Sequence, residues 1–273
     1  MWKKRTSILS AAVMSIALVM GLGLASCSTS DNPTVDPEEG VVPGLGEMFE
    51  WDYIPSDPGD EWSLIFTITS EPTEENPEQP REVRLTGYGW LPDKCDLDIP
   101  ATVNHNRQEY TVTAIGDKAF EGYLNLSSVT IPASVKSIGE RAFLYCNNIV
   151  SVSFADDSQL ETIGYQVFYS CYSLAAITIP ASVITISDGA FGKCSSLASV
   201  SFADDAQLET IGHEAFNSCT SLETITLPAS VKEIGDAAFD GCTSLKTVYL
   251  NSHPKIGDWA FPNGVELKYP DEN

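Results

Sequence analysis

The chain has 273 residues and a formal net charge of −23, from 38 acidic and 15 basic side chains. Nucleic acids and anionic membrane surfaces are bound by clustered Lys and Arg, so this charge argues against either as an electrostatic partner. The three histidines, His105, His213 and His253, are scattered, and no nucleophile or metal-ligand motif surrounds them. We therefore expect no enzyme activity, no resident metal and no cofactor.

The first 26 residues have the pattern of an export signal. Basic residues at 3–5 precede an uncharged apolar stretch over 8–24, and small residues lead to Cys27. That order predicts a segment removed on export, which we exclude from the fold. The four residues ending in Cys27 also resemble the lipobox of bacterial lipoproteins, which implies that Cys27 becomes an acylated N-terminus. An uncleaved membrane anchor, or an ordinary signal with an incidental Cys27, are the alternatives.

Residues 27–46 contain three prolines and four acidic residues but no basic one. This composition predicts a lipid-anchored, disordered linker between the acylated cysteine and the folded part of the chain.

The segment 47–110 is expected to be a β-rich N-terminal cap. Alternating apolar residues over 63–69 and 82–88 predict two strands, and the polar, proline-containing stretch 71–78 between them predicts a loop. Residues 97–103 already resemble a phrase that recurs later in the chain. Solenoids need such caps because a terminal coil otherwise leaves an apolar face in water.

From residue 111 to residue 273 the unit Ile-Gly-x-x-Ala-Phe recurs. Its isoleucines are 23, 25, 23, 25, 23 and 22 residues apart, and a phenylalanine follows each one five residues later. Periods of this length predict a solenoid in which each coil buries its apolar edge against its neighbours. The isoleucines are Ile115, Ile138, Ile163, Ile186, Ile211, Ile234 and Ile256.

Each coil is expected to contain two short strands and a helical turn. In the second coil, alternation around Val129 predicts a strand that Pro132 ends, and 135–138 predicts a second extended stretch. Gly139 is then expected to turn the chain, and 141–145 to form about one helical turn that packs its phenylalanine inward.

Five of the seven cysteines fall three residues after a repeat phenylalanine. Equivalent side chains of stacked coils point the same way, so we expect a ladder of buried free thiols rather than disulfides. Cys95 lies outside this ladder. The ladder comprises Cys146, Cys171, Cys194, Cys219 and Cys242.

The two longer coils contain aspartate pairs, Asp156-Asp157 and Asp204-Asp205. The pairs are two coils apart, about 10 Å at strand spacing, which is too far for one ion to bridge. We expect each pair to form a turn, because Asp bonds its own backbone, with calcium binding as the alternative.

The complete phrase, Leu-x-x-Val-x-Ile-Pro-x-x-Val-x-x-Ile-Gly-x-x-Ala-Phe-x-x-Cys, resembles the BspA-like (Treponema-type) leucine-rich repeats of bacterial surface proteins. The resemblance covers about 160 of the 273 residues. It implies a leucine-rich repeat solenoid with a role in binding or adhesion, often to host proteins, and it carries over no catalytic residue. The last unit, 259–264, lacks the cysteine and is expected to be the C-terminal cap.

Two surfaces are candidates for recognition. Apart from Ala176 and the aromatic Tyr249, Ser and Thr flank the central residue of each repeat strand, which predicts an outward array of hydroxyls that is a poor anchor for proteins. On the predicted helical-turn side, Tyr145, Tyr165, Tyr169 and Tyr172 form a candidate ligand-binding patch, with local packing between coils, or contact with the cap, as the alternative explanation.

These features predict a non-catalytic lipoprotein, anchored through Cys27 to the bacterial outer membrane and displayed on the cell surface. Its expected partner is an extracellular or host protein, or a glycan. A structural envelope protein without a soluble ligand is the alternative.

Overall fold

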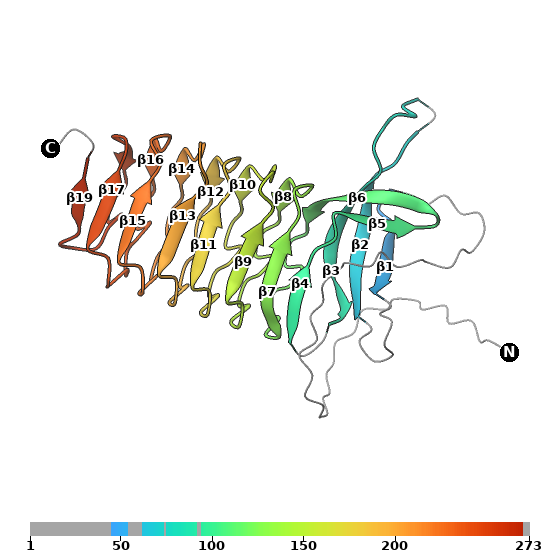
Figure 1. The fold of residues 1–273 in the computed structure, drawn as a ribbon, viewed down its shortest axis with the longest axis horizontal. Helices are drawn as coiled ribbons and strands as arrows, with labels where there is room; N and C mark the ends of the chain where they lie inside the picture. Colours follow the sequence, from blue (N-terminus) through green and yellow to red (C-terminus); the bar gives the residue numbers. More distant parts are fainter. Residues whose placement is uncertain (1–44, 54–61, 74, 92–93, 270–273) are drawn as a thin grey trace.

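A computed structural model describes residues 45–53, 62–73, 75–91 and 94–269. The predicted signal, Cys27 and nearly all of the predicted linker lie outside these residues. The described residues form nineteen strands and no helix, so none of them belongs to a helix that could cross a membrane. The coils stack along the long axis of the molecule, from the cap at one end to β19 at the other (Figure 1).

The N-terminal region is a small sheet that continues into the solenoid. Strands β1 (Met48–Tyr53), β2 (Trp62–Ser70) and β3 (Glu82–Trp90) are antiparallel, and β5 (Thr102–His105) forms a hairpin with β6 (Gln108–Ile115). The two strands predicted here are confirmed. Because β3 pairs in parallel with β6, the cap merges with the first coil without a break in the sheet.

A narrow sheet runs the whole length of the solenoid. After β6 it contains one two-residue strand from each coil, and the repeat isoleucines are direct register partners from Ile115 to Ile256. The two extra residues of the longer coils are therefore accommodated elsewhere. The two-residue strands are β8 (Ser137–Ile138), β10 (Thr162–Ile163), β12 (Thr185–Ile186), β14 (Thr210–Ile211), β16 (Glu233–Ile234) and β18 (Lys255–Ile256).

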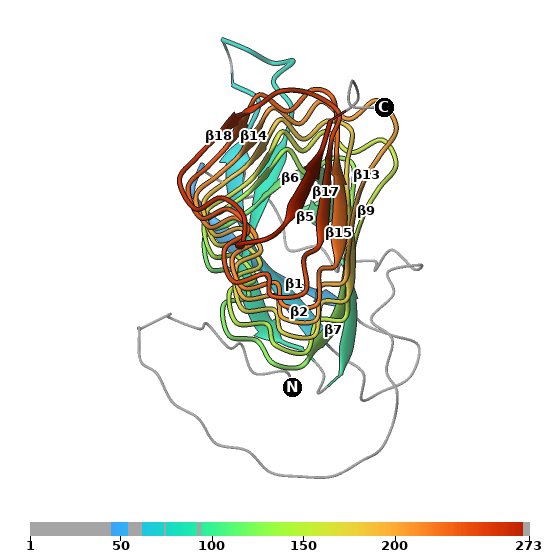
Figure 2. The same ribbon diagram turned by 90° about the vertical axis from the view of Figure 1, so that its left-hand side faces the viewer.

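A second set of longer strands forms what we call the broad face, on another side of the coil (Figure 2). It begins at β4, where Leu97 is the partner of Val129, so the resemblance of 97–103 to the repeat is confirmed in space. The strands are β4 (Cys95–Asp98), β7 (Leu126–Ile131), β9 (Ser151–Phe154), β11 (Ala176–Ile179), β13 (Ser199–Phe202), β15 (Thr224–Leu227), β17 (Thr247–Leu250) and β19 (Glu266–Lys268).

The repeat phenylalanines form one continuous stack in the core. Neighbouring ring centroids are 5.1 to 5.5 Å apart, with interplanar angles of 4° to 14°. Tyr88 of the cap extends the stack over Phe120 at 5.7 Å. Aromatic rings bury a large apolar area, so this stack is a main source of stability between coils.

The predicted helical turn is wrong. In the second coil Arg141 and Tyr145 have φ angles of 58° and 61°, and the same two positions are left-handed in the next four coils. An α-helix uses its amides internally, whereas here the amide of Phe143 donates to Val167 in the next coil at 2.9 Å. The segment is a series of tight turns that pairs with its neighbours, and we call it the turn side.

Gly139 begins the turn, as expected, and the structure shows why this residue is glycine. A Cβ here would lie 2.5 Å from the amide nitrogen of Asp117 in the preceding coil. Asp117 Oδ1 accepts a hydrogen bond of 2.9 Å from the amide of Glu140, which ties the same two coils together. The glycine is therefore required by the close approach of neighbouring backbones.

The cysteine ladder is confirmed as buried and free. Each thiol donates to the carbonyl of the repeat phenylalanine one coil earlier, at distances of 3.0 to 3.3 Å. Burial raises the pKa of Cys146 and of Cys194 to about 12, because the thiolate would lose its hydration. These thiols are packing elements rather than nucleophiles.

Candidate binding surfaces

The broad face presents hydroxyl side chains to solvent, as the strand pattern predicted. The central residue of each strand is buried, and its neighbours are exposed or half-buried. Some hydroxyls bond across coils: Thr178 Oγ1 lies 2.9 Å from Ser201 Oγ, and Ser153 Oγ donates to Thr130 Oγ1 at 3.2 Å. Hydroxyl side chains thus both strengthen the sheet and form its outer surface.

The ladder of the broad face opens after each of the two longer coils, which the sequence did not predict. All four residues of β11 pair with β13, and all four of β15 pair with β17. Between β9 and β11 only one register pair remains, and β13 and β15 belong to separate sheets. Both openings follow a strand that ends in phenylalanine, Phe154 or Phe202, where other coils have Ile or Leu. On the broad face, the strand of each longer coil therefore forms at most one register pair with the strand of the next coil.

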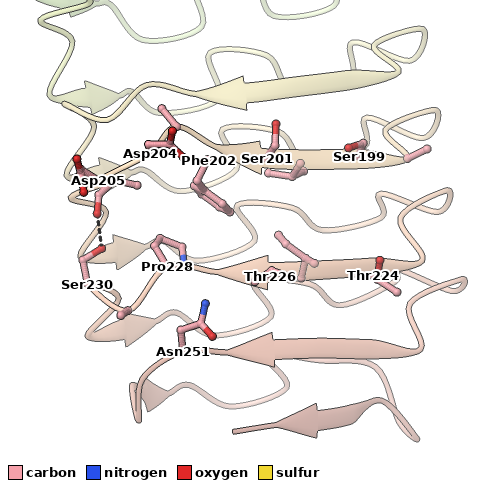
Figure 3. A pocket seen from close by; sticks show the side chains of 16 residues that line it. Ser199, Ser201, Phe202, Asp204, Asp205, Thr224, Thr226, Pro228, Ser230 and Asn251 are labelled. Atoms are coloured by element: carbon pink, nitrogen blue, oxygen red, sulfur yellow. Dashed lines mark hydrogen bonds between the residues drawn. The ribbon is translucent and has the colours of Figure 1, made fainter. Parts of the chain in front are cut away.

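A hollow lies at each opening. The large hollow, between β13 and β15, has a volume of about 670 Å³ (Figure 3). The small hollow, between β9 and β11, has a volume of about 340 Å³. Every residue that lines the small hollow has a counterpart 48 residues later in the large one. The large hollow is lined on its outer side by Ser199, Ser201, Phe202, Asp204, Asp205, Thr224, Thr226, Ser230 and Asn251.

The aspartate pairs form turns at the edges of these hollows, as predicted. The amide of Ser158 donates to the carbonyl of Ala155 at 3.0 Å across the first pair, and Asp205 of the second has a φ of 58°. Ser230 Oγ from the next coil donates to the carbonyl of Ala206 at 3.0 Å (Figure 3). Within the described ranges, no three His, Cys, Asp or Glu side chains are grouped to hold a metal ion.

The four candidate tyrosines all lie on the turn side of two adjacent coils, and the amide of Tyr145 donates to the carbonyl of Tyr169 at 3.0 Å. Tyr145, Tyr172 and Tyr165 are 47 %, 43 % and 36 % exposed. We call these four residues the tyrosine patch. Large aromatic side chains at this exposure have no packing function that the repeat requires, since other coils carry small or polar residues there.

Two of the four tyrosines already contact a cation. The guanidinium carbon of Arg141 lies 5.4 Å from the ring centre of Tyr165, and Lys193 Nζ lies 5.3 Å from that of Tyr169. Tyr169 is half-buried because its ring covers Gly192, where an added Cβ would lie 2.7 Å away. Packing between coils thus accounts for Tyr169, whereas Tyr145 and Tyr172 are the more available for a ligand.

The histidines lie in three different places. His105 stacks on Phe49 at 4.0 Å in the cap, and burial lowers its pKa, which favours the neutral ring. His213 Nδ1 lies 2.9 Å from the carbonyl oxygen of Asp236, and His253 stacks on Tyr269. Each imidazole has a structural contact, and the three do not converge on a common site.

The repeat region shows which protein family this chain belongs to. Residues 113–246 and 161–271 match the BspA-type leucine-rich repeat region, in six copies. The chain belongs to the BspA-type leucine-rich repeat family. A search of curated proteins finds no match.

Several solved structures are similar to this chain, and the first of those named here shares its fold. The pneumococcal vaccine antigen PcpA is 22 % identical, with a TM-score of 0.59, over 82 % of this chain and 70 % of that one. A leucine-rich repeat protein from Bacteroides ovatus is 25 % identical, with a TM-score of 0.45, over 74 % and 69 %. The T. pallidum leucine-rich repeat protein is 25 % identical, with a TM-score of 0.42, over 74 % and 83 %.

Proposed function

We propose that this BspA-type repeat protein is a non-catalytic cell-surface lipoprotein, anchored to the outer membrane through Cys27, whose solenoid binds an extracellular or host protein or a glycan. The tyrosine patch is its main contact. The single observation that carries the proposal is the division of residues in each coil. The repeated Ile, Ala, Phe and Cys side chains are buried, except for half-buried Ile256 and Phe261 in the last coil, and the exposed aromatics occupy positions that the fold leaves free.

Recognition energy at interfaces is concentrated in a few aromatic and Arg side chains. Tyr145 and Tyr172, together with Arg141 over the ring of Tyr165, provide these residue types within two coils. Two χ angles per tyrosine keep the entropy cost of ordering the patch low. The likeness in fold to PcpA, described as a vaccine antigen, supports display outside the cell.

The binding test uses the whole chain with Cys27→Ser, which prevents acylation, against panels of immobilised matrix proteins and glycans. For any protein ligand found, Tyr145→Ser and Tyr172→Ser should each weaken binding about tenfold or more, a loss of about 1.4 kcal/mol. Tyr249→Ser is the matched control, because Tyr249 is 40 % exposed but lies on the broad face. If all three variants bound the ligand with equal affinity, the tyrosine patch would not be the binding site. Failure on both panels would favour the structural envelope protein.

Anchoring is tested separately in cells. The native chain should fractionate with the outer membrane and be cleaved by protease added to intact cells, whereas Cys27→Ser should be released in soluble form. Full protection of the native chain from the protease would place it on the periplasmic side and contradict surface display.

A further inference from the structure

We propose that the two hollows of the broad face form one repeated binding site for a neutral linear polysaccharide. The site rests on the proposed position outside the cell but not on the tyrosine patch, which lies on the turn side. The observations that carry it are the equivalence of the hollows, the chemistry of their lining and the opened strand edges.

The hollows are built by equivalent residues. Phe154 and Phe202 occupy the same position, as do Thr178 and Thr226, and the aspartate turns lie beside both hollows. Each hollow occurs once in every pair of coils, so the two lie in line along the solenoid. Two coils correspond to about 10 Å at strand spacing, the length scale on which a polysaccharide repeats one or two sugar units. A polymer engaging both hollows would gain affinity from the second contact.

The lining offers what a sugar needs. The hydroxyls of Thr224 and Thr226 can donate to or accept from sugar hydroxyls, and Asn251 adds an amide. The carboxylates of Asp204 and Asp205 are exposed acceptors beside them. Half-buried Phe202 supplies an apolar ring against which the C–H face of a sugar can pack.

The opened ladder adds backbone partners. Strand β13 is paired on one side only, with β11, and β15 on one side only, with β17, so both are edges of their sheets. The amides and carbonyls of β13 that point away from β11, and those of β15 that point away from β17, therefore face the large hollow. Strand edges of this kind need water or a ligand as partner. Such an edge presents both amide donors and carbonyl acceptors, and sugar hydroxyls can pair with either.

The charge of the lining selects among polysaccharides. The large hollow contains two carboxylates and no Lys or Arg, in a protein of net charge −23. An acidic polysaccharide would therefore be repelled. The broad face around the hollow also lacks the Trp, Tyr and Arg cluster typical of protein hot spots, since its one tyrosine, Tyr249, lies outside the lining.

The test measures binding of the whole Cys27→Ser chain to soluble linear glucan, xylan and mannan, with polygalacturonate as the acidic comparison, by calorimetry. We expect at least one neutral polymer to bind and polygalacturonate not to bind. Thr224→Arg, which places a long side chain in the large hollow, should weaken that binding at least tenfold. Thr247→Arg is the matched control, because Thr247 is the register partner of Thr224 on β17 but lines neither hollow.

Thr178→Arg probes the small hollow and should weaken binding of polymers more than binding of a disaccharide, since a disaccharide is too short to fill both hollows. Circular dichroism confirms folding of each variant. Absence of binding by every neutral polymer, or equal binding by Thr224→Arg and Thr247→Arg, would overturn the proposal. Tyr145→Ser should leave polysaccharide binding unchanged, so this site and the tyrosine patch can fail independently.

Discussion

The narrow sheet and the broad face belong to the same coils but behave differently. The narrow sheet pairs isoleucine with isoleucine at every step, whereas the broad face opens after each longer coil. The narrow sheet lies next to the glycines that bring neighbouring backbones together, and it begins the turns that carry the phenylalanine stack. Neighbouring coils are therefore held in close contact at every step along the narrow sheet but not along the broad face.

This difference shows how a solenoid tolerates variation. Once the narrow sheet and the core stack fix the register, a strand on the broad face can lose its ladder without loss of the fold, because each coil is still held to both neighbours. The two extra residues of the longer coils are accommodated on the side where separation is permitted. Binding surfaces can therefore arise there without disturbing the core.

The largest expected effect comes from the core stack. Phe191→Ala should lower the free energy of unfolding by about 3 to 5 kcal/mol, because it leaves a cavity between two stacked rings. Phe202→Leu, on the broad face, should cost less than about 1.5 kcal/mol, since other coils carry Ile or Leu at this position. Urea denaturation of both variants measures their free energies of unfolding. Equal losses would contradict the view that the broad face tolerates changes that the core stack does not.

The close approach of coils predicts a smaller effect. Gly212→Ala places a Cβ about 2.7 Å from the amide nitrogen of Asp188 and should cost about 1 to 3 kcal/mol. Ser187 occupies the same repeat position one coil earlier, and Ser187→Ala should change stability by less than about 0.5 kcal/mol. The same denaturation measurement applies. If Gly212→Ala left the free energy of unfolding unchanged, the coils beside the narrow sheet would be as free to separate as those of the broad face.

The thiol ladder predicts a pH dependence specific to the core. Because the pKa of Cys194 rises from 9.0 in the unfolded chain to about 12 when folded, the unfolded state loses its proton first. Stability from this group is complete below pH 9 and falls between pH 9 and 12, by about 1.4 kcal/mol at pH 10. Cys194→Ala should lose correspondingly less stability between pH 8 and pH 10. An identical pH dependence in both proteins would contradict burial of the neutral thiol.

Much of the fold followed from the sequence because the repeated residues are those of the core. The spacing of the isoleucines predicted the register of the narrow sheet, and the position of Cys194 after Phe191 predicted an inward thiol. The helical turn failed because periodicity over five residues does not reveal left-handed φ angles, which Arg141 and Tyr145 adopt without being glycine. Pairing between coils, rather than local preference, decides the backbone there.

The candidate sites were predicted less completely. The hydroxyl array and the aspartate turns followed from strand alternation and turn chemistry. The hollows were missed, although the sequence contained a signal: Phe154 and Phe202 end the strands of the two longer coils. A larger residue at a fixed position cannot by itself show that the next strand separates. Likewise, the sequence placed Tyr169 in the tyrosine patch, but only the contact with Gly192 shows that it is partly a packing residue.

Amide hydrogen exchange at single-residue resolution tests the contrast between the two sides most directly. We predict slow exchange for the amides that pair along the narrow sheet, and for β17, which is flanked by strands on both sides. The β15 amides that point away from β17 should exchange much faster. Uniform protection of 224–227 equal to that of 247–250 would contradict the account, because it would show that the broad face is closed at this step.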